Sequence, residues 1–181
     1  MYFNAFLFDL DGVFYIDNSL IPGAKEILAS IKQKSIPYKF ITNTTTLCRE
    51  SLSKKLINMG LNVSQNNIVS ANYVGAQFLK KLNNSSYRLL LTEDAKKDYK
   101  NINLNNTSPD YIIIGDIGEK WDFNLMNEIF NQVMNGSKII ALHKGKYFMT
   151  NAGLQIDTGA FIKGIDYATG VVSKSIGKPN K

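Results

Sequence analysis

The segment "FLFDLDGVFY", residues 6–15, decides how the rest of the chain is interpreted. An apolar run typical of a buried strand ends at Asp9, and a second carboxylate follows at Asp11, just before Gly12. Asp-Gly between apolar residues is a strong hairpin-turn signal that needs no chemistry. Two carboxylates at a strand end can also share one reaction, one as nucleophile and one as proton donor. The segment alone leaves both interpretations open.

After this segment, short apolar runs alternate with helical patterns. Strand-like runs at residues 5–9, 37–42 and 67–71 are separated by residues 21–34 and 44–60, whose apolar side chains recur at helical spacing. Strands that alternate with helices predict a parallel sheet covered by helices. The expected fold class is therefore α/β, with a Rossmann-like parallel sheet.

The middle of the chain repeats this alternation. Helices are expected at residues 72–82, 93–100, 123–136 and 160–170. Strands are expected at residues 87–92, 110–116 and 138–143, followed by a hairpin over residues 145–159. An apolar group in and beside the third helix predicts that it packs in a core. Its members are Trp121, Phe123, Met126, Ile129, Phe130 and Met134.

The composition favours a soluble protein in a reducing compartment. The 181 residues are 44% hydrophobic and 20% charged, enough for one core or for a small core with a second lobe. The net charge of +6 comes from scattered lysines without a basic block, which does not favour nucleic-acid binding. The one cysteine, Cys48, cannot form an internal disulfide, and no apolar run reaches the roughly 18 residues of a membrane span. We therefore expect a cytoplasmic protein with no nucleic-acid or membrane partner.

Polar residues follow three of the strand-like runs. Asp9 and Asp11 follow the first, Thr42 and Asn43 the second, and Lys178 lies in a Gly-Lys-Pro sequence after the last. In open parallel sheets, ligands bind outside the carboxyl ends of the strands, so these groups are expected to meet. Ordinary alternatives exist, because Thr42 and Asn43 could begin a helix and Lys178 could lie in a solvated loop.

These residue types fit phosphoryl transfer through a covalent intermediate. Asp9 would attack phosphorus, and Asp11 would protonate the leaving oxygen and then activate water. Mg²⁺ is the expected cofactor, with Asp9, Asp11 and a backbone carbonyl forming its site. The Lys178 ammonium would balance charge, while the Thr42 hydroxyl and the N–H groups near Asn43 would hold phosphate oxygens.

Three short motifs occur in one order along the chain: "DLDGV", "ITNTT" and "GKP". They resemble the first three motifs of the haloacid dehalogenase superfamily phosphatases. "DLDGVFYIDNSLIPGA" and "ALHKGKYFMTNAGLQIDTGAFIKGIDYATG" are similar to subfamily IIA, whose members carry a large C2-type α/β cap. The resemblance implies that Asp9 is the nucleophile, Asp11 the acid/base and a metal-site residue with Asp9, Thr42 and Asn43 phosphate-binding residues, and Lys178 the charge-balancing lysine.

The spacing of these motifs locates the cap. The stretch between Asp9 and Thr42 is too short for an inserted domain, whereas the stretch between Thr42 and Lys178 is long enough. We expect a haloacid dehalogenase-like core at residues 1–71 and 159–181, with an inserted α/β cap at residues 72–158.

The superfamily carries a fourth motif after the lysine, typically Gly-Asp followed by a further acid, which completes the Mg²⁺ site. This chain ends three residues after Lys178, so the core is expected to be incomplete at its C-terminus and the activity impaired. Asp116 is a poor substitute for the missing acid, because it precedes Lys178 and belongs to the expected cap. His143, the lone histidine, is expected to be structural rather than catalytic.

Two functions remain open. The first is Mg²⁺-dependent hydrolysis of a small phosphorylated substrate through an aspartyl-phosphate. The second is a catalytically inactive relative that acts at most as a ligand- or partner-binding module. A homo-oligomer formed through the first strand is a further expectation, because an apolar edge strand pairs readily with another chain.

Overall fold

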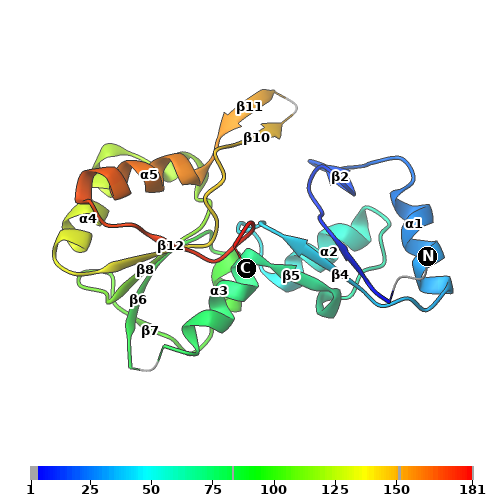
Figure 1. The fold of residues 1–181 in the computed structure, drawn as a ribbon, viewed down its shortest axis with the longest axis horizontal. Helices are drawn as coiled ribbons and strands as arrows, with labels where there is room; N and C mark the ends of the chain where they lie inside the picture. The colour runs from blue at the N-terminus through cyan, green and yellow to red at the C-terminus, as the bar shows by residue number, and fades with distance from the viewer. Residues whose placement is uncertain (1–3, 83, 151, 181) are drawn as a thin grey trace.

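The computed structural model describes residues 4–82, 84–150 and 152–180, which fold into two α/β units arranged along the long axis of the molecule (Figure 1). The first unit contains a three-stranded parallel sheet in the order β1-β4-β5. Its strands are β1 (Phe6–Phe8), β4 (Tyr38–Thr42) and β5 (Ile68–Ser70). Helices α1 (Ala24–Gln33) and α2 (Arg49–Asn58) connect them.

Both helices pack on one face of this sheet. Phe40 of β4 and Ile68 of β5 meet Leu28 of α1 and Leu52 of α2 in a single buried cluster. Because side chains alternate across a strand, Leu7 of β1 points to the opposite face, where it is 68% exposed. Among the described residues, β1 pairs only with β4, so it is an edge strand.

The second unit contains a five-stranded parallel sheet in the order β12-β9-β8-β6-β7. Its strands are β6 (Ser86–Leu90), β7 (Asn103–Leu104), β8 (Tyr111–Ile114), β9 (Lys138–Ala141) and β12 (Lys174–Ser175). The short strands β7 and β12 lie at its two edges, so the long apolar strands β8 and β9 are central.

Helices cover both faces of the second sheet, which explains the continuous apolar runs of its central strands. Ile113 packs on one face, against α3 and the short helix η2. Its neighbours Ile112 and Ile114 pack on the other face, against α4 and α5. The bounds are α3 (Ala71–Leu79), η2 (Ala95–Asp98), α4 (Phe123–Met134) and α5 (Thr158–Thr169).

Two hairpins lie apart from the sheets. β2 (Tyr15–Ile16) and β3 (Ser19–Leu20) form one in the first unit, and β10 (Tyr147–Thr150) and β11 (Gly153–Ile156) form the other in the second. The β10–β11 hairpin projects from the second unit on the side where β2 lies (Figure 1). The remaining short helices are η1 (Gln65–Asn67) and η3 (Gly118–Lys120).

The second unit takes in residues 159–175, which the sequence had grouped with the first unit. Ile162 and Ile165 of α5 share a buried cluster with Ile129 of α4, and β12 pairs with β9. The apolar face of α5 therefore packs within the second unit. The chain returns to the first unit only after β12. Residues 1–3 and 181 of the expected core lie outside the described residues.

The apolar group around α4 is only partly in the core. Ile129 is fully buried, and Trp121 and Met126 pack beside it, but Phe123 is 81% exposed and Met134 is 60% exposed. At about 100° per residue, these two positions lie at least roughly 120° around the helix from Ile129, away from the sheet. The prediction that both are core residues is wrong.

Within the described ranges, no helix combines the length and the apolar character needed to cross a membrane.

Candidate active site

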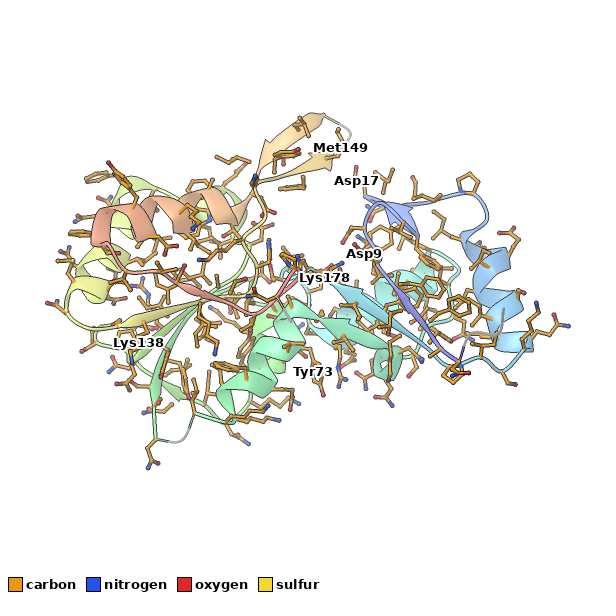
Figure 2. The ribbon with its side chains drawn as sticks, viewed as in Figure 1. Asp9, Asp17, Tyr73, Lys138, Met149 and Lys178 are labelled. Carbon is orange, nitrogen blue, oxygen red and sulfur yellow. The ribbon has the colours of Figure 1, made fainter. Side chains whose placement is uncertain are left out.

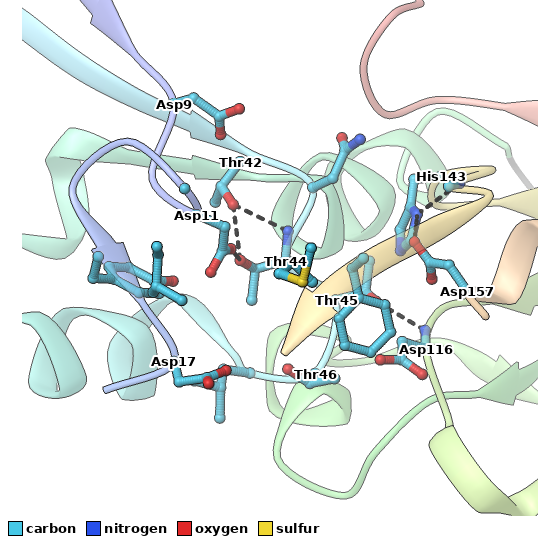
Figure 3. Close-up of a pocket in the computed structure, with 18 of the residues that line it drawn as sticks. Asp9, Asp11, Asp17, Thr42, Thr44, Thr45, Thr46, Asp116, His143 and Asp157 are labelled. Carbon is cyan, nitrogen blue, oxygen red and sulfur yellow. Dashed lines mark hydrogen bonds and ion pairs between the residues drawn. The ribbon is translucent and has the colours of Figure 1, made fainter. Parts of the chain in front are cut away.

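A cavity of about 570 Å³ opens between the two units (Figure 3). Its walls include all five residues that the sequence singled out, Asp9, Asp11, Thr42, Asn43 and Lys178. The first two follow β1, the next two lie at the end of β4, and the lysine follows β12. The carboxyl ends of two parallel strands of the first sheet thus meet the last part of the described chain in one place.

Asp9 and Lys178 form the shortest ionic contact in the cavity. Lys178 Nζ lies 2.6 Å from Asp9 Oδ2, and both side chains are about half-exposed. The other oxygen, Asp9 Oδ1, accepts a hydrogen bond from the N–H of Leu10 at 2.8 Å. The carboxylate is therefore oriented by its own backbone, and a positive charge lies directly beside it.

Asn43 fixes the position of Lys178 through both ends of its side-chain amide. Asn43 Oδ1 accepts the N–H of Lys178 at 2.9 Å, and Asn43 Nδ2 donates to the carbonyl of Lys178 at 3.1 Å. The sequence had assigned Asn43 to phosphate binding. Its side chain is occupied by the lysine backbone, which leaves the Asn43 backbone N–H as the group for that role.

Close packing at Gly177 completes this connection. A Cβ at Gly177 would lie 2.3 Å from the carbonyl oxygen of Leu142 and 2.8 Å from Asn43 Oδ1. Only glycine therefore lets the segment before Lys178 run between the end of β9 and the Asn43 side chain without moving them.

Asp11 is held by a chain of hydroxyl groups (Figure 3). Thr44 Oγ1 donates to Asp11 Oδ2 at 3.1 Å and lies 2.8 Å from Thr42 Oγ1. Because the Thr44 proton is used on Asp11, the Thr42 hydroxyl acts as donor to Thr44. Thr42 Oγ1 also accepts the N–H of Thr44 at 3.2 Å. Thr42 thus organises the loop and orients the second carboxylate.

Tyr15 also lies beside Asp11. It is 1% exposed and forms an isolated β-bridge with Asp11. Burial, reinforced by the negative charge of Asp11, raises the pKa of the Tyr15 phenol far above its ordinary value, so the hydroxyl keeps its proton. Sequence reasoning missed both Tyr15 and Thr44. The only signal was their place within "DGVFY" and "TNTTT".

The second unit contributes a buried histidine to the cavity wall. His143 Nδ1 accepts the N–H of Gly145 at 3.2 Å and lies 3.7 Å from Asp157 Oδ2. Burial lowers the pKa of His143, although the charges of Asp157 and Asp116 oppose the shift. The imidazole is therefore neutral near pH 7, with its proton on Nε2.

Asp116 lines the cavity and also stabilises a turn. Its N–H donates to Thr45 Oγ1 at 2.8 Å, and its Oδ1 accepts the N–H of Gly118 at 2.8 Å. It does not join Asp9 and Asp11 as a third metal ligand, because the described residues contain no group of three or more acidic, histidine or cysteine side chains that could hold a metal ion.

Carboxylates of the second unit cap the helix that follows the Thr42 loop. Asp94 accepts the N–H of Cys48 at 2.9 Å and the hydroxyl of Ser51 at 2.9 Å. Cys48 is the N-cap of α2, so Thr42 and Asn43 do not begin this helix, which was the ordinary alternative for them. The threonines instead form the cavity loop. These bonds attach the second unit to the loop that holds Asp11.

The two-unit α/β fold thus brings two acidic residues, which follow β1, and a lysine, which follows β12, into one cavity. A family model described as haloacid dehalogenase-like hydrolase matches residues 6–105, and the chain belongs to this family. The resemblance inferred from the three motifs is confirmed.

Individual relatives agree with this family. The chain is 29% identical over 177 residues to haloacid dehalogenase-like hydrolase domain-containing protein 2 of Homo sapiens, covering 98% of this chain and 67% of that protein. It is 29% identical over 180 residues to phospholysine phosphohistidine inorganic pyrophosphate phosphatase of Homo sapiens, covering 96% of this chain and 66% of that protein. The chain thus spans about two thirds of the length of these relatives.

A solved structure agrees at the level of the fold. The crystal structure of a 4-nitrophenylphosphatase from Thermotoga maritima matches with a TM-score of 0.86 and 27% identity, covering 96% of this chain and 67% of that chain. The prediction of an α/β fold with a parallel-sheet core is confirmed.

Proposed function

We propose that this chain is a Mg²⁺-dependent phosphatase that hydrolyses a small phosphorylated substrate through an aspartyl-phosphate at Asp9. The observation that carries the proposal is the Asp9–Lys178 ion pair in the same cavity as the hydroxyl-held Asp11. Two relatives are named as phosphatases, which supports the same class of reaction.

In the first step, an Asp9 carboxylate oxygen attacks phosphorus and forms a new P–O bond. The bond between phosphorus and the leaving oxygen breaks, and Asp11, in its carboxylic acid form, gives its proton to that oxygen. The leaving group departs with its oxygen protonated as a hydroxyl. Lys178, 2.6 Å from Asp9, reduces the repulsion between the attacking carboxylate and the anionic phosphate.

In the second step, Asp11 is a carboxylate and acts as a base. A water molecule attacks phosphorus while Asp11 takes one of its protons, and the P–O bond to Asp9 breaks. Inorganic phosphate forms, and both carboxyl groups return to their starting states. The Thr44 hydroxyl, 3.1 Å from Asp11 Oδ2, keeps the base in one orientation through both steps.

Phosphate oxygens would be held at the loop after β4. The Thr42 hydroxyl and the backbone N–H of Asn43 are the proposed donors, and the Lys178 ammonium is the proposed counter-charge. Thr42 is 2% exposed and its hydroxyl donates to Thr44 in this structure, so donation to a phosphate oxygen requires this hydrogen bond to break.

The donor set at the strand end suits magnesium. Asp9 and Asp11 offer hard carboxylate oxygens, the ligands that Mg²⁺ prefers, and both line the cavity. Asp9 and Asp11 are therefore the proposed metal-site residues. When bound, Mg²⁺ supplies positive charge beside the transferring phosphoryl group.

A binding module without turnover is the second candidate. The observation in its favour is that the described residues bring only two carboxylates, Asp9 and Asp11, to the end of β1, with no cluster of three metal-binding side chains. Such a protein would bind phosphate esters at Thr42 and Lys178 without cleaving them.

We also propose that residues 1–71 form the catalytic core and that the cap begins at residue 72. The contacts of α5 and β12 with the second sheet support a cap that extends to the end of β12. With this division, the only later segment that belongs to the core is the one after β12, which carries Lys178.

The test is phosphate release from para-nitrophenyl phosphate, with and without added Mg²⁺, for the native chain, Asp9→Asn and Asp122→Asn. Asp122 is a matched control because it caps α4 outside the cavity. Mg²⁺-dependent turnover that is lost only in Asp9→Asn supports the phosphatase. Binding of the ester without release in the native chain supports the binding module.

A further inference from the structure

We propose that the site selects phosphate esters whose leaving group carries a positively charged nitrogen a few atoms from phosphorus, that is, phosphorylated amino alcohols and related ammonium compounds. The inference rests on the proposed function and names the substrate class for the same cavity. It arises from the charges and the aromatic side chains on the wall away from the Asp9–Lys178 pair.

The cavity holds more negative charge than the proposed chemistry uses. Five carboxylates line it, against two lysines, and three of the carboxylates have no part in the reaction. These three are Asp17, Asp116 and Asp157. Lys178 is paired with Asp9, and Lys55 lies over the Tyr15 ring at 4.5 Å from its centroid. The wall beyond the phosphate therefore presents negative charge to the leaving group at Asp116 and Asp157.

The arrangement of these carboxylates fits an organic cation better than a metal ion. Asp17 lies in the turn between β2 and β3, Asp116 follows β8, and Asp157 precedes α5. They form no group of three that could hold a metal ion within the described residues. Carboxylates spread around a cavity act through their summed field, which suits a larger cation that touches several walls.

Aromatic and thioether side chains line the same part of the molecule as these carboxylates. Tyr147, Phe148 and Met149 of strand β10 line the same cavity and are 63%, 40% and 62% exposed. Met149 lies on the β10–β11 hairpin and Asp17 on the β2–β3 turn of the other unit (Figure 2), and both line the cavity. Aromatic faces attract ammonium groups through the ring quadrupole. The combination of rings and carboxylates therefore favours a cation over a neutral or anionic group.

The buried histidine does not cancel this field. Burial holds the pKa of His143 below its ordinary value, so it adds no positive charge near pH 7. Asp157 is held in place, since its Oδ1 accepts the N–H of Thr158 at 2.6 Å while Oδ2 faces His143 at 3.7 Å. An anionic leaving group would meet these carboxylates and be repelled.

Three two-carbon esters of matched size test the inference: phosphoethanolamine with an ammonium group, hydroxyethyl phosphate with a hydroxyl and phosphoglycolate with a carboxylate. The native chain is expected to rank kcat/KM in that order. The quantity compared between variants is the ratio of kcat/KM for the ammonium ester to that for the hydroxyl ester, because differences in intrinsic reactivity then cancel.

The variants remove the negative charge of a carboxylate but keep the size of its side chain. Asp116→Asn and Asp157→Asn keep an oxygen that can accept the N–H of Gly118 or Thr158, and Asn is also a good helix N-cap. Each is expected to lower the ratio about fivefold, the effect of one partly exposed charge pair. Asp122→Asn is the matched control, an N-cap outside the cavity, and should leave the ratio unchanged.

A binding measurement separates this inference from the proposed function. Calorimetry of the three esters with Asp9→Asn, which cannot form the aspartyl-phosphate, reports the same preference without turnover. If the native chain hydrolyses no ester but the variant binds the ammonium ester most tightly, the function fails and the inference stands. If phosphoglycolate is bound or hydrolysed at least as well as phosphoethanolamine, or if the Asp116 and Asp157 substitutions leave the ratio unchanged, the inference is overturned.

Discussion

Lys178 Nζ lies 2.6 Å from Asp9 Oδ2, and this ion pair joins the first strand to the last part of the described chain (Figure 2). The lysine follows the outermost strand of the second sheet, yet its ammonium reaches the strand end of the first. The pair is half-exposed, so its value to stability is small. We expect the lysine to matter in the reaction, because its charge reduces the repulsion between the Asp9 carboxylate and an anionic phosphate.

Lys178→Met is therefore expected to lower kcat/KM for para-nitrophenyl phosphate by about 100-fold, the loss typical of one group that stabilises developing negative charge. The melting temperature should change little. Lys100→Met, at an exposed position outside the cavity, is the control. Full activity in Lys178→Met would exclude the lysine from the reaction.

Asn43→Ala tests positioning rather than chemistry. The change removes both bonds to the Lys178 backbone, so kcat should fall by roughly tenfold or more as the lysine moves away from Asp9. Asn67→Ala is a matched control, since its amide also donates to a backbone carbonyl, that of Tyr38, away from the cavity. If Asn43 acts through Lys178, the double variant Asn43→Ala/Lys178→Met should be no worse than Lys178→Met alone. Additive losses would point to direct phosphate contact by Asn43.

Gly177→Ala should displace the segment that carries Lys178, because its Cβ would lie 2.3 Å from the Leu142 carbonyl oxygen. Activity is expected to fall at least about tenfold, since a displacement of about 1 Å can be that costly. Gly164→Ala in α5 meets only Met126 Cε at 3.5 Å and should gain up to about 1 kcal/mol of stability from helix propensity. Melting temperature and turnover are measured for both variants. Equal turnover in the two would contradict the close packing of Gly177 against the Leu142 carbonyl and Asn43.

Asp94 links the stability of the chain to pH. Burial raises its pKa, but hydrogen bonds from Lys97, from the Cys48 N–H and from Ser51 outweigh burial and lower the pKa from 3.8 to about 2. Because the folded-state pKa is depressed, the contribution is fully present above pH 3.8 and is lost as the pH falls through about 2. It amounts to about 2 kcal/mol.

Asp94→Asn should therefore flatten the fall in stability between these two pH values, measured as urea midpoints at several pH values. Burial, and to a smaller extent the charge of Asp94, raises the pKa of the neighbouring Asp98, so the opposite contribution of Asp98 changes mainly above pH 3.8, outside the range compared. An unchanged pH dependence in Asp94→Asn would contradict the assignment.

The periodic parts of the fold were predictable from sequence, because they depend on local patterns. The apolar run before Asp9 became β1, and the helical spacing of residues 21–34 became α1. The rule that parallel strands present ligands at their carboxyl ends was enough to expect Asp9, Asp11 and Lys178 in one cavity.

The parts that were missed depend on contacts between distant segments. Whether α5 covers the first or the second sheet is decided by packing of Ile162 against α4, which no local pattern encodes. Two further contacts also join segments that are distant in the sequence. Asn43 holds the Lys178 backbone, and Thr44 donates to Asp11. A threonine run before a helix is typical of an N-cap. Here α2 has Cys48 as its N-cap instead, and the Cys48 N–H donates to Asp94 of the second unit.

The most direct test of the account is whether Asp9 takes up the phosphoryl group. The chain is mixed with para-nitrophenyl phosphate and Mg²⁺, quenched in acid within the first turnover, and digested for peptide mass spectrometry. The account predicts one added phosphoryl group on the peptide that contains Asp9, more of it in Asp11→Asn, where water is no longer activated, and none in Asp9→Asn. Phosphate release with no adduct at Asp9 in any of these proteins, or an adduct on another residue, would contradict it.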